Sequence, residues 1–180
     1  MRILLTTTSF TDTPGKHQEK LKSLNYKIDI LRGPLKEEIL LPIISNYDGI
    51  ICGDDEITRK VILKGASGKL KVISKYGIGL DSIDLNTAKE LEIPVTNCPG
   101  VNHITVAEHV FSLVLTYYKN IHISYNITKK GWWHRYVGSE IHEKNIGILG
   151  LGKIGKEVAI RANSFGMNVF AFDPYPDKEF

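Results

Sequence analysis

The sequence predicts an α/β fold in which parallel β-sheets are covered by helices, arranged as two domains. Three observations support this prediction. Short aliphatic segments alternate with helical segments at the spacing of crossover units, a Pro-Gly break follows Cys98, and a glycine-rich turn near residue 150 joins a strand to a helix. The 180 residues, with 42% hydrophobic and 24% charged side chains, are also enough for a well-packed core.

The first domain, residues 1–98, is predicted from five short apolar segments that end at glycine or polar residues. We expect strands at 3–6, 26–31, 49–53, 70–75 and 94–97. Helices are expected between them at 15–24, 36–45, 58–64 and 85–92. The second of these helices is expected to continue through Pro42, and Asp84 is the expected N-cap of the last.

The second domain, residues 99–180, begins with the longest predicted helix, at 102–119. Either Asn102 or Thr105, the latter with Glu108 at capping-box spacing, can cap it. Its apolar face is expected to consist of Val106, Val110, Leu113, Val114 and Tyr117. A second helix at 121–130 and a loop to about residue 144 follow.

The glycine-rich turn is the most informative segment of the chain. A strand at 145–149 leads into G-x-G-x-x-G (Gly150, Gly152, Lys153, Ile154 and Gly155), a helix at 156–165 and a strand at 168–172 that ends at Asp173. Such a turn places backbone amides against a diphosphate, while the terminal acid binds the adenosine ribose. The pattern predicts a Rossmann site for NAD rather than NADP, since no arginine accompanies Asp173; the alternative is a purely structural glycine turn.

Charge and cysteine content exclude several classes of function. A net charge of +3, with the lysines scattered along the chain, does not indicate a nucleic-acid partner. No apolar run is long enough to cross a bilayer, and the N-terminus is too short and polar for a signal peptide. The two distant cysteines suggest neither a metal site nor a disulfide, so we expect a cytoplasmic protein.

Four motifs together resemble the D-isomer specific 2-hydroxyacid dehydrogenases, in the order and spacing of that family. They lie at 74–84, 93–100, 106–109 and 147–155. The resemblance implies a flavodoxin-like substrate domain followed by a Rossmann NAD-binding domain. It also implies that the amides of Gly77, Ile78 and Gly79 bind the carboxylate of a small 2-hydroxy or 2-oxo acid; the less favoured alternative is an ordinary strand-ending turn. Val106, with Asn102 and the 105–107 segment, would lie near the nicotinamide, or serve only capping and core packing.

The same resemblance implies a catalytic arginine, glutamate and histidine, and none of the three matches a residue in this sequence. They are expected beyond Phe180, so the Rossmann domain would be truncated after its second strand, leaving the helix face of Val158, Ala162 and Phe165 partly uncovered. His109 and His134 are interpreted as structural. We therefore expect the 180-residue chain to show no turnover and to bind NAD weakly. The alternative is a non-catalytic NAD-sensing or dimerisation module of the same fold.

Two further segments bear on the substrate and on assembly. Asp54, Asp55 and Glu56 follow a strand and would repel a phosphorylated acid, unless they form a solvated turn outside the pocket. Trp132 and Trp133 follow the linking helices, where they indicate either a homodimer surface or packing against their own domain.

Overall fold

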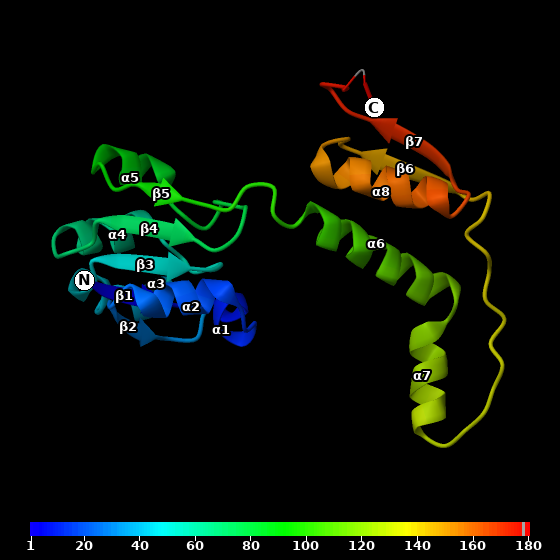
Figure 1. Cartoon of the computed structure of the whole chain (residues 1–180), viewed down its shortest axis with the longest axis horizontal. Helices are drawn as coiled ribbons and strands as arrows, with labels where there is room; N and C mark the ends of the chain where they lie inside the picture. Colours follow the sequence, from blue (N-terminus) through cyan, green and yellow to red (C-terminus); the bar gives the residue numbers. More distant parts are fainter. Residues whose placement is uncertain (178) are drawn as a thin grey trace. The chain divides into compact units, whose positions relative to one another are not determined.

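The computed structural model describes residues 1–177 and 179–180, and the chain forms two compact units, Met1–Pro99 and Gly100–Phe180 (Figure 1). Each unit contains its own parallel β-sheet. The predicted α/β fold class is therefore confirmed.

The sheet of the first unit has five strands in the order β2-β1-β3-β4-β5. The strands are β1 (Arg2–Leu5), β2 (Lys27–Ile30), β3 (Gly49–Cys52), β4 (Val72–Lys75) and β5 (Val95–Thr96), all paired in parallel. This is the flavodoxin-like order, in which the chain winds outward from β1 in both directions. It brings the ends of β1, β3 and β4 together at one edge of the sheet.

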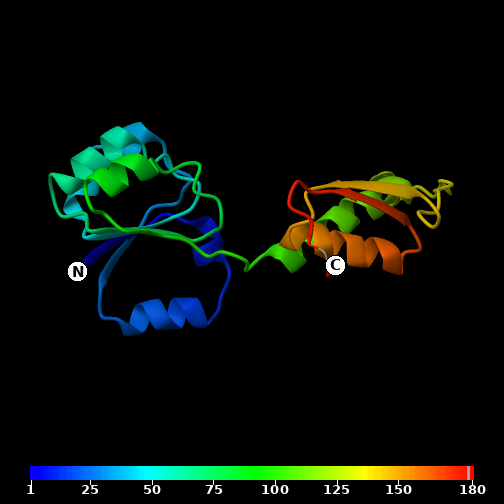
Figure 2. The same cartoon turned by 90° about the horizontal axis from the view of Figure 1, so that it is seen from above.

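The core of this unit lies on one face of the sheet. Leu4 pairs with Ile50, Ile50 with Ile73, and Ile73 with Val95, so one row of apolar side chains crosses four strands. Helices α4 (Arg59–Ala66) and α5 (Leu85–Glu90) cover this face, whereas α2 (Lys16–Ser23) lies on the other (Figure 2). Each fully buried aliphatic side chain contributes about 1.5–3 kcal/mol relative to exposure, so this row stabilises the sheet that carries the loops described below.

Two helical segments of this unit differ from the prediction. The helix expected at 36–45 is divided into α3 (Glu37–Leu40) and a 3-10 turn, η1 (Ile44–Asn46). Pro42 explains the break, because it has no amide hydrogen to donate and its ring clashes with the preceding turn. The short helix α1 (Thr8–Asp12) was not predicted, since five residues of mixed polarity carry no clear helical period. The N-cap prediction for Asp84 is confirmed, because its carboxylate accepts a hydrogen bond from the Thr87 amide at 2.9 Å.

The second unit contains the predicted strand, turn, helix and strand. Its elements are α6 (His103–Tyr118), α7 (Ile121–Lys129), β6 (Asn145–Leu149), α8 (Lys153–Ser164) and β7 (Asn168–Phe172). Strands β6 and β7 pair in parallel through all five positions, with α8 as their crossover. Helix α8 begins at Lys153, three residues before the predicted start, so the glycine turn leads directly into its first turn.

Helix α6 packs against α8 with a face that overlaps the predicted one only in part, since Val110 and Val114 of the predicted face do pack against the core of this unit. Ala107 and Phe111 are buried, whereas Leu113 and Tyr117 are 60% and 72% exposed. The Phe111 ring stacks on Phe165 at 5.2 Å between centroids. The valines and the neighbouring leucine and tyrosine are all apolar, so hydropathy alone could not fix which positions face inward. Neither α6 nor any other helix of the described residues has the length and apolar character of a membrane span.

Because α6 supplies a second layer, the expected gap over α8 is largely absent. Val158 and Ala162 are 7% and 0% exposed, contrary to prediction, and only Phe165 remains 40% exposed. The opposite side of this unit is less covered. Strands β6 and β7 pair only with each other among the described residues, and Phe170 and Phe172 are 61% and 66% exposed.

A buried carboxylate ties together three loops at the carboxyl edge of the five-stranded sheet. Asp55, which is fully buried, accepts hydrogen bonds from the Thr6 hydroxyl at 2.6 Å, the Leu35 amide at 2.7 Å and the Gly53 amide at 2.8 Å. These donors follow β1, β2 and β3 respectively. Since every donor is a neutral group, the carboxylate is stabilised by hydrogen bonds alone.

Replacing this carboxylate should destabilise the first unit. Asp55→Ala leaves two buried donors and one half-buried donor without this acceptor, so we expect the free energy of unfolding of this unit to fall by about 3 kcal/mol. Hydrogen exchange of the β3 amides measures this quantity. Glu19→Ala, at an exposed position of α2, is the control, with an expected change within about 0.5 kcal/mol. A similar small change for Asp55→Ala would contradict the role assigned to it.

Candidate functional site

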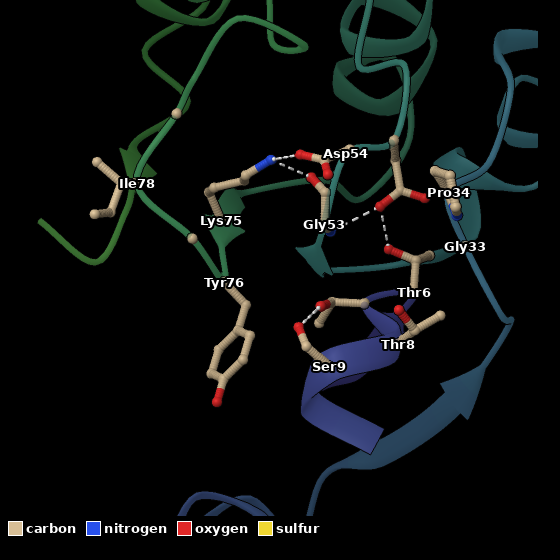
Figure 3. A pocket seen from close by; sticks show the side chains of 14 residues that line it. Thr6, Thr8, Ser9, Gly33, Pro34, Gly53, Asp54, Lys75, Tyr76 and Ile78 are labelled. Carbon is tan, nitrogen blue, oxygen red and sulfur yellow. Dashed lines mark hydrogen bonds and ion pairs between the residues drawn. The ribbon is translucent and has the colours of Figure 1, made fainter. Parts of the chain in front are cut away.

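A polar cavity of about 220 Å³ lies at the carboxyl edge of the first unit's sheet (Figure 3). Loops after β1, β2, β3 and β4 form its walls. The lining residues include Thr6, Thr7, Thr8, Ser9, Gly33, Pro34, Gly53, Asp54, Asp55, Lys75, Tyr76, Gly77, Ile78 and Gly79. Ligands of open α/β sheets bind at this edge, and a cavity of this size suits a small metabolite rather than a macromolecule.

The loop of Gly77, Ile78 and Gly79 offers backbone donors to this cavity. Two of its carbonyl groups are occupied, because the Cys98 amide donates to the Gly77 oxygen and the Asn97 side chain donates to the Ile78 oxygen, both at 2.8 Å. Its three amides donate no hydrogen bond within the described chain. Successive free amides of this kind form an anion-binding site, which is the chemistry predicted for these residues.

The glycine at position 77 is needed because a neighbouring side chain lies against it. A Cβ atom there would lie 3.1 Å from Cε of Lys75, closer than ordinary van der Waals contact. A side chain at this position would require the Lys75 stem to move by a few tenths of an ångström. Glycine at position 77 therefore lets the amide loop lie close to the buried lysine.

Lys75 is a buried cation that the sequence analysis missed. Its side chain is 5% exposed, and its ammonium donates to the Gly53 carbonyl and to the Asp54 carboxylate, both at 2.6 Å. Figure 3 shows the side chain reaching from β4 toward these two residues. The strand period could have found it, since Lys75 lies two residues after the buried Ile73 and so shares its face.

The three consecutive acids after β3 point in three different directions, so they do not act as one negative patch. Asp55 is the buried tie described above, and the side chain of Asp54 is 90% exposed and pairs with Lys75. Glu56 pairs with Lys36 at 2.5 Å, and that hydrogen bond lowers the pKa of the Glu56 carboxyl. The first interpretation of this segment is that its acids repel a phosphorylated acid. Of the three, Asp54 is the one whose exposed side chain lies beside the cavity cation, so this interpretation depends chiefly on Asp54.

The glycine turn of the second unit has the backbone geometry that a dinucleotide site requires. Gly150 has φ of +94°, a conformation that other residues rarely adopt. A Cβ atom on Gly155 would collide with the Gly150 carbonyl oxygen, so helix and turn can pack closely only with glycine there. A Cβ atom on Gly152 would meet nothing within 4 Å, which leaves open space beside the turn.

The amino end of α8 also has unused donors. Gly152 is its N-cap and supplies no capping side chain. The amides of Gly152, Lys153, Ile154 and Gly155 donate no hydrogen bond within the described residues. Free amides at a helix N-terminus attract anions, so the predicted residues fit a diphosphate group.

Asp173 binds the glycine turn directly. One carboxylate oxygen accepts from the Leu151 amide at 2.6 Å, and the other accepts from the Tyr175 amide at 2.8 Å. Each oxygen retains acceptor capacity for a further donor such as a ribose hydroxyl. The residue was predicted as a ribose ligand, and in the structure it also fixes the position of the turn.

Near the start of α6, Asn102 is the N-cap residue, the first of the two capping alternatives. Its side-chain oxygen is buried and accepts no hydrogen bond within the described part of the chain. Val106 follows one turn later and is half-buried. The position of Val106 in its unit does not by itself assign it to a cofactor.

Comparisons with known proteins agree with this arrangement. A family model described as D-isomer specific 2-hydroxyacid dehydrogenase, catalytic domain, matches residues 8–166. The chain is 38% identical over 171 residues to a D-3-phosphoglycerate dehydrogenase of Methanocaldococcus jannaschii, covering 93% of this chain and 32% of that protein. It therefore spans about a third of this relative's length.

Two solved structures extend the likeness to three dimensions. The apo-structure of D-lactate dehydrogenase from Escherichia coli has a TM-score of 0.85 at 26% identity, covering 99% of this chain and 57% of that one. An NAD⁺-bound 3-phosphoglycerate dehydrogenase of Entamoeba histolytica has a TM-score of 0.73 at 28% identity, covering 99% and 56%. With its sequence and its fold both matched, the chain belongs to the family of D-isomer specific 2-hydroxyacid dehydrogenases.

Proposed function

We propose that this chain provides the substrate loop and the dinucleotide turn of an NAD-dependent oxidoreductase, which transfers hydride between a small 2-hydroxy acid and NAD. One observation carries the proposal. The amides of Gly77, Ile78 and Gly79 make no hydrogen bond within the described chain, while their loop is fixed through its carbonyls. A rigid loop with free donors binds a carboxylate without reorganising.

On the cofactor side, the proposed ligands are the amides of the glycine turn and the carboxylate of Asp173. Gly150, Gly152, Lys153, Ile154 and Gly155 would hold the diphosphate, and Asp173 the adenosine ribose. Bound NAD would supply the hydride-accepting ring. Asp173 favours NAD over NADP, because a 2′-phosphate would meet its negative charge. Val106 is proposed as a further contact of the cofactor.

The proton-transfer groups of the reaction are not assigned to residues of this chain. The family's arginine, glutamate and histidine have no counterpart among the 180 residues, so the chain by itself is expected to form no NADH from a 2-hydroxy acid. A non-catalytic NAD-sensing or dimerisation module is the second candidate, favoured by the exposed tryptophans of the second unit. Formation of NADH by the isolated chain would contradict this expectation and would exclude the second candidate as well.

The two free cysteines are consistent with a reducing compartment, and we propose a cytoplasmic protein. Cys52 is buried, and burial raises the pKa of its thiol to about 12. The thiol therefore remains protonated at neutral pH, so no role as a nucleophile is proposed for it.

The substrate loop can be tested by titrating the ¹⁵N-labelled chain with D-lactate. We expect the amide signals of Gly77, Ile78 and Gly79 to shift, and Gly77→Ala to weaken binding about tenfold or more, because its methyl group displaces the Lys75 stem. Gly147→Ala is the matched control, since a Cβ atom there meets nothing within 4 Å. Unshifted loop amides at saturating D-lactate would refute the proposed substrate site.

The cofactor site can be tested by comparing NAD with NADP in saturation-transfer NMR. We expect weak binding that favours NAD about tenfold, and Asp173→Asn should reduce this preference to about twofold because it removes the negative charge. Asp177→Asn, which removes an exposed carboxylate paired with Lys156, is the control. Equal binding of both cofactors by the unmodified chain would contradict the assignment of Asp173.

We also propose that the chain forms a homodimer through the segment around Trp132 and Trp133. Their side chains are 73% and 86% exposed and, with Ile127, Lys130 and His134, they line a hollow of about 450 Å³. Exposed tryptophans are typical of the anchor residues of interfaces. Side chains as exposed as these do not fit the alternative of packing against their own domain.

Replacing both tryptophans by alanine should shift the sedimentation of the chain from dimer to monomer. Each anchor is expected to contribute about 2 kcal/mol or more, which together would raise the dissociation constant at least a hundredfold. Tyr175→Ala removes another aromatic ring that is 90% exposed and serves as the control. If sedimentation is unchanged by the double substitution, this surface is not the interface.

A further inference from the structure

We propose that Asp54, by occupying the ammonium of Lys75, makes the pocket select 2-hydroxy acids that carry an uncharged hydroxyl on the third carbon over acids that carry a phosphate there. This inference rests on the proposed substrate site at Gly77–Gly79 and names the chemistry of the part of the substrate that lies beyond the carboxylate.

The first step concerns the supply of positive charge. Among the described residues that line the cavity, Lys75 is the only one with a cationic side chain. Two of its three donors are already used, by the Gly53 carbonyl and the Asp54 carboxylate, each at 2.6 Å. The ammonium of Lys75 is thus neutralised by the Asp54 carboxylate. Because Asp54 belongs to the same chain, its effective concentration at Lys75 is high, and a free anion must compete with it.

The second step concerns the surrounding negative charge. Asp55 also lines the cavity, and its carboxylate is fully buried with only neutral donors around it. The cavity is therefore lined by two carboxylates and one ammonium, and a phosphate would add about two further negative charges to it. Binding it would require the displacement of Asp54, whose side chain is 90% exposed and free to turn toward solvent.

The third step concerns the neutral groups of the pocket. Thr7, Thr8 and Ser9 line one wall, and the Thr7 and Ser9 hydroxyls lie 3.1 Å apart. Figure 3 shows Thr8 and Ser9 on α1, on the side of the cavity opposite Ile78. Hydroxyl groups can both donate and accept, and a carboxylate accepts, so this wall together with Asp54 matches a substrate hydroxyl.

The position of Asp54 makes it a specificity residue and not a part of the fold. It bonds no backbone group, whereas Asp55 next to it ties three loops together. Removing its charge should therefore change which acid binds without unfolding the unit. Lys75 would keep the Gly53 carbonyl as a partner and would be free to bind an incoming anion.

The test compares D-glycerate with 3-phospho-D-glycerate, titrated into the ¹⁵N-labelled chain and read at the amides of Gly77 and Gly79. We expect the unmodified chain to bind D-glycerate about tenfold more tightly, and Asp54→Asn to reverse or abolish this preference. Glu56→Gln is the matched control. It removes the same charge two residues further along the chain, from a side chain that pairs with Lys36 and does not line the cavity. It should leave the ratio of the two affinities unchanged.

Each outcome of this experiment decides a different claim. Equal or tighter binding of 3-phospho-D-glycerate by the unmodified chain overturns the inference, as does an unchanged affinity ratio in Asp54→Asn. If neither acid shifts the loop amides, while circular dichroism shows the chain folded, the proposed substrate site itself fails. A parallel titration with inorganic phosphate separates binding at Lys75 from binding of the whole phosphorylated acid, since phosphate alone should shift Gly77 only in Asp54→Asn.

Discussion

The cavity of the first unit depends on the hydrogen bonds of one buried carboxylate. Asp55 joins loops that follow three separate strands, and the amide of Gly53 is one of its donors. The carbonyl of the same glycine accepts from Lys75, whose stem in turn lies against Gly77. A single residue, Gly53, thus links an acid and a base through its amide and its carbonyl, and Lys75 in turn lies against the anion-binding loop.

Both candidate sites have the same physical basis, which is a run of backbone amides that have no hydrogen-bond partner among the residues the structure describes. In one unit the amides follow β4, and in the other they open α8 after β6. Each run lies at the carboxyl end of a parallel strand, where the chain leaves the sheet and its amides lose their ladder partners. Side chains then tune the two sites differently: Lys75 and Asp54 adjust the charge beside the first, and Asp173 adds an acceptor beside the second.

The sequence was sufficient for the strands, the glycine turn and the amide loop, because each depends on local patterns of apolar residues and glycine. It was insufficient where one pattern of apolar residues is compatible with more than one helix boundary or more than one buried helix face. The broken helix at Pro42 and the rotated face of α6 are two such cases, since the deciding contacts come from distant segments. The structural role of Asp55 and the place of Lys75 in the site were missed for the same reason. Their partners lie 20 or more residues away in sequence, except for the Gly53 amide beside Asp55, and only the strand order brings them together.

The sparse cover of β6 and β7 has a consequence for the handling of this protein. Among the described residues, β6 and β7 have no neighbour but each other, so their outer sides present unsatisfied amides and carbonyls, and the rings of Phe170 and Phe172 are exposed beside them. Bare edges of this kind recruit strands from other molecules. At high concentration, intermolecular β-augmentation at this edge would compete with folding and favour aggregation, so a solubilising charge placed on β7 is a practical route to well-behaved samples.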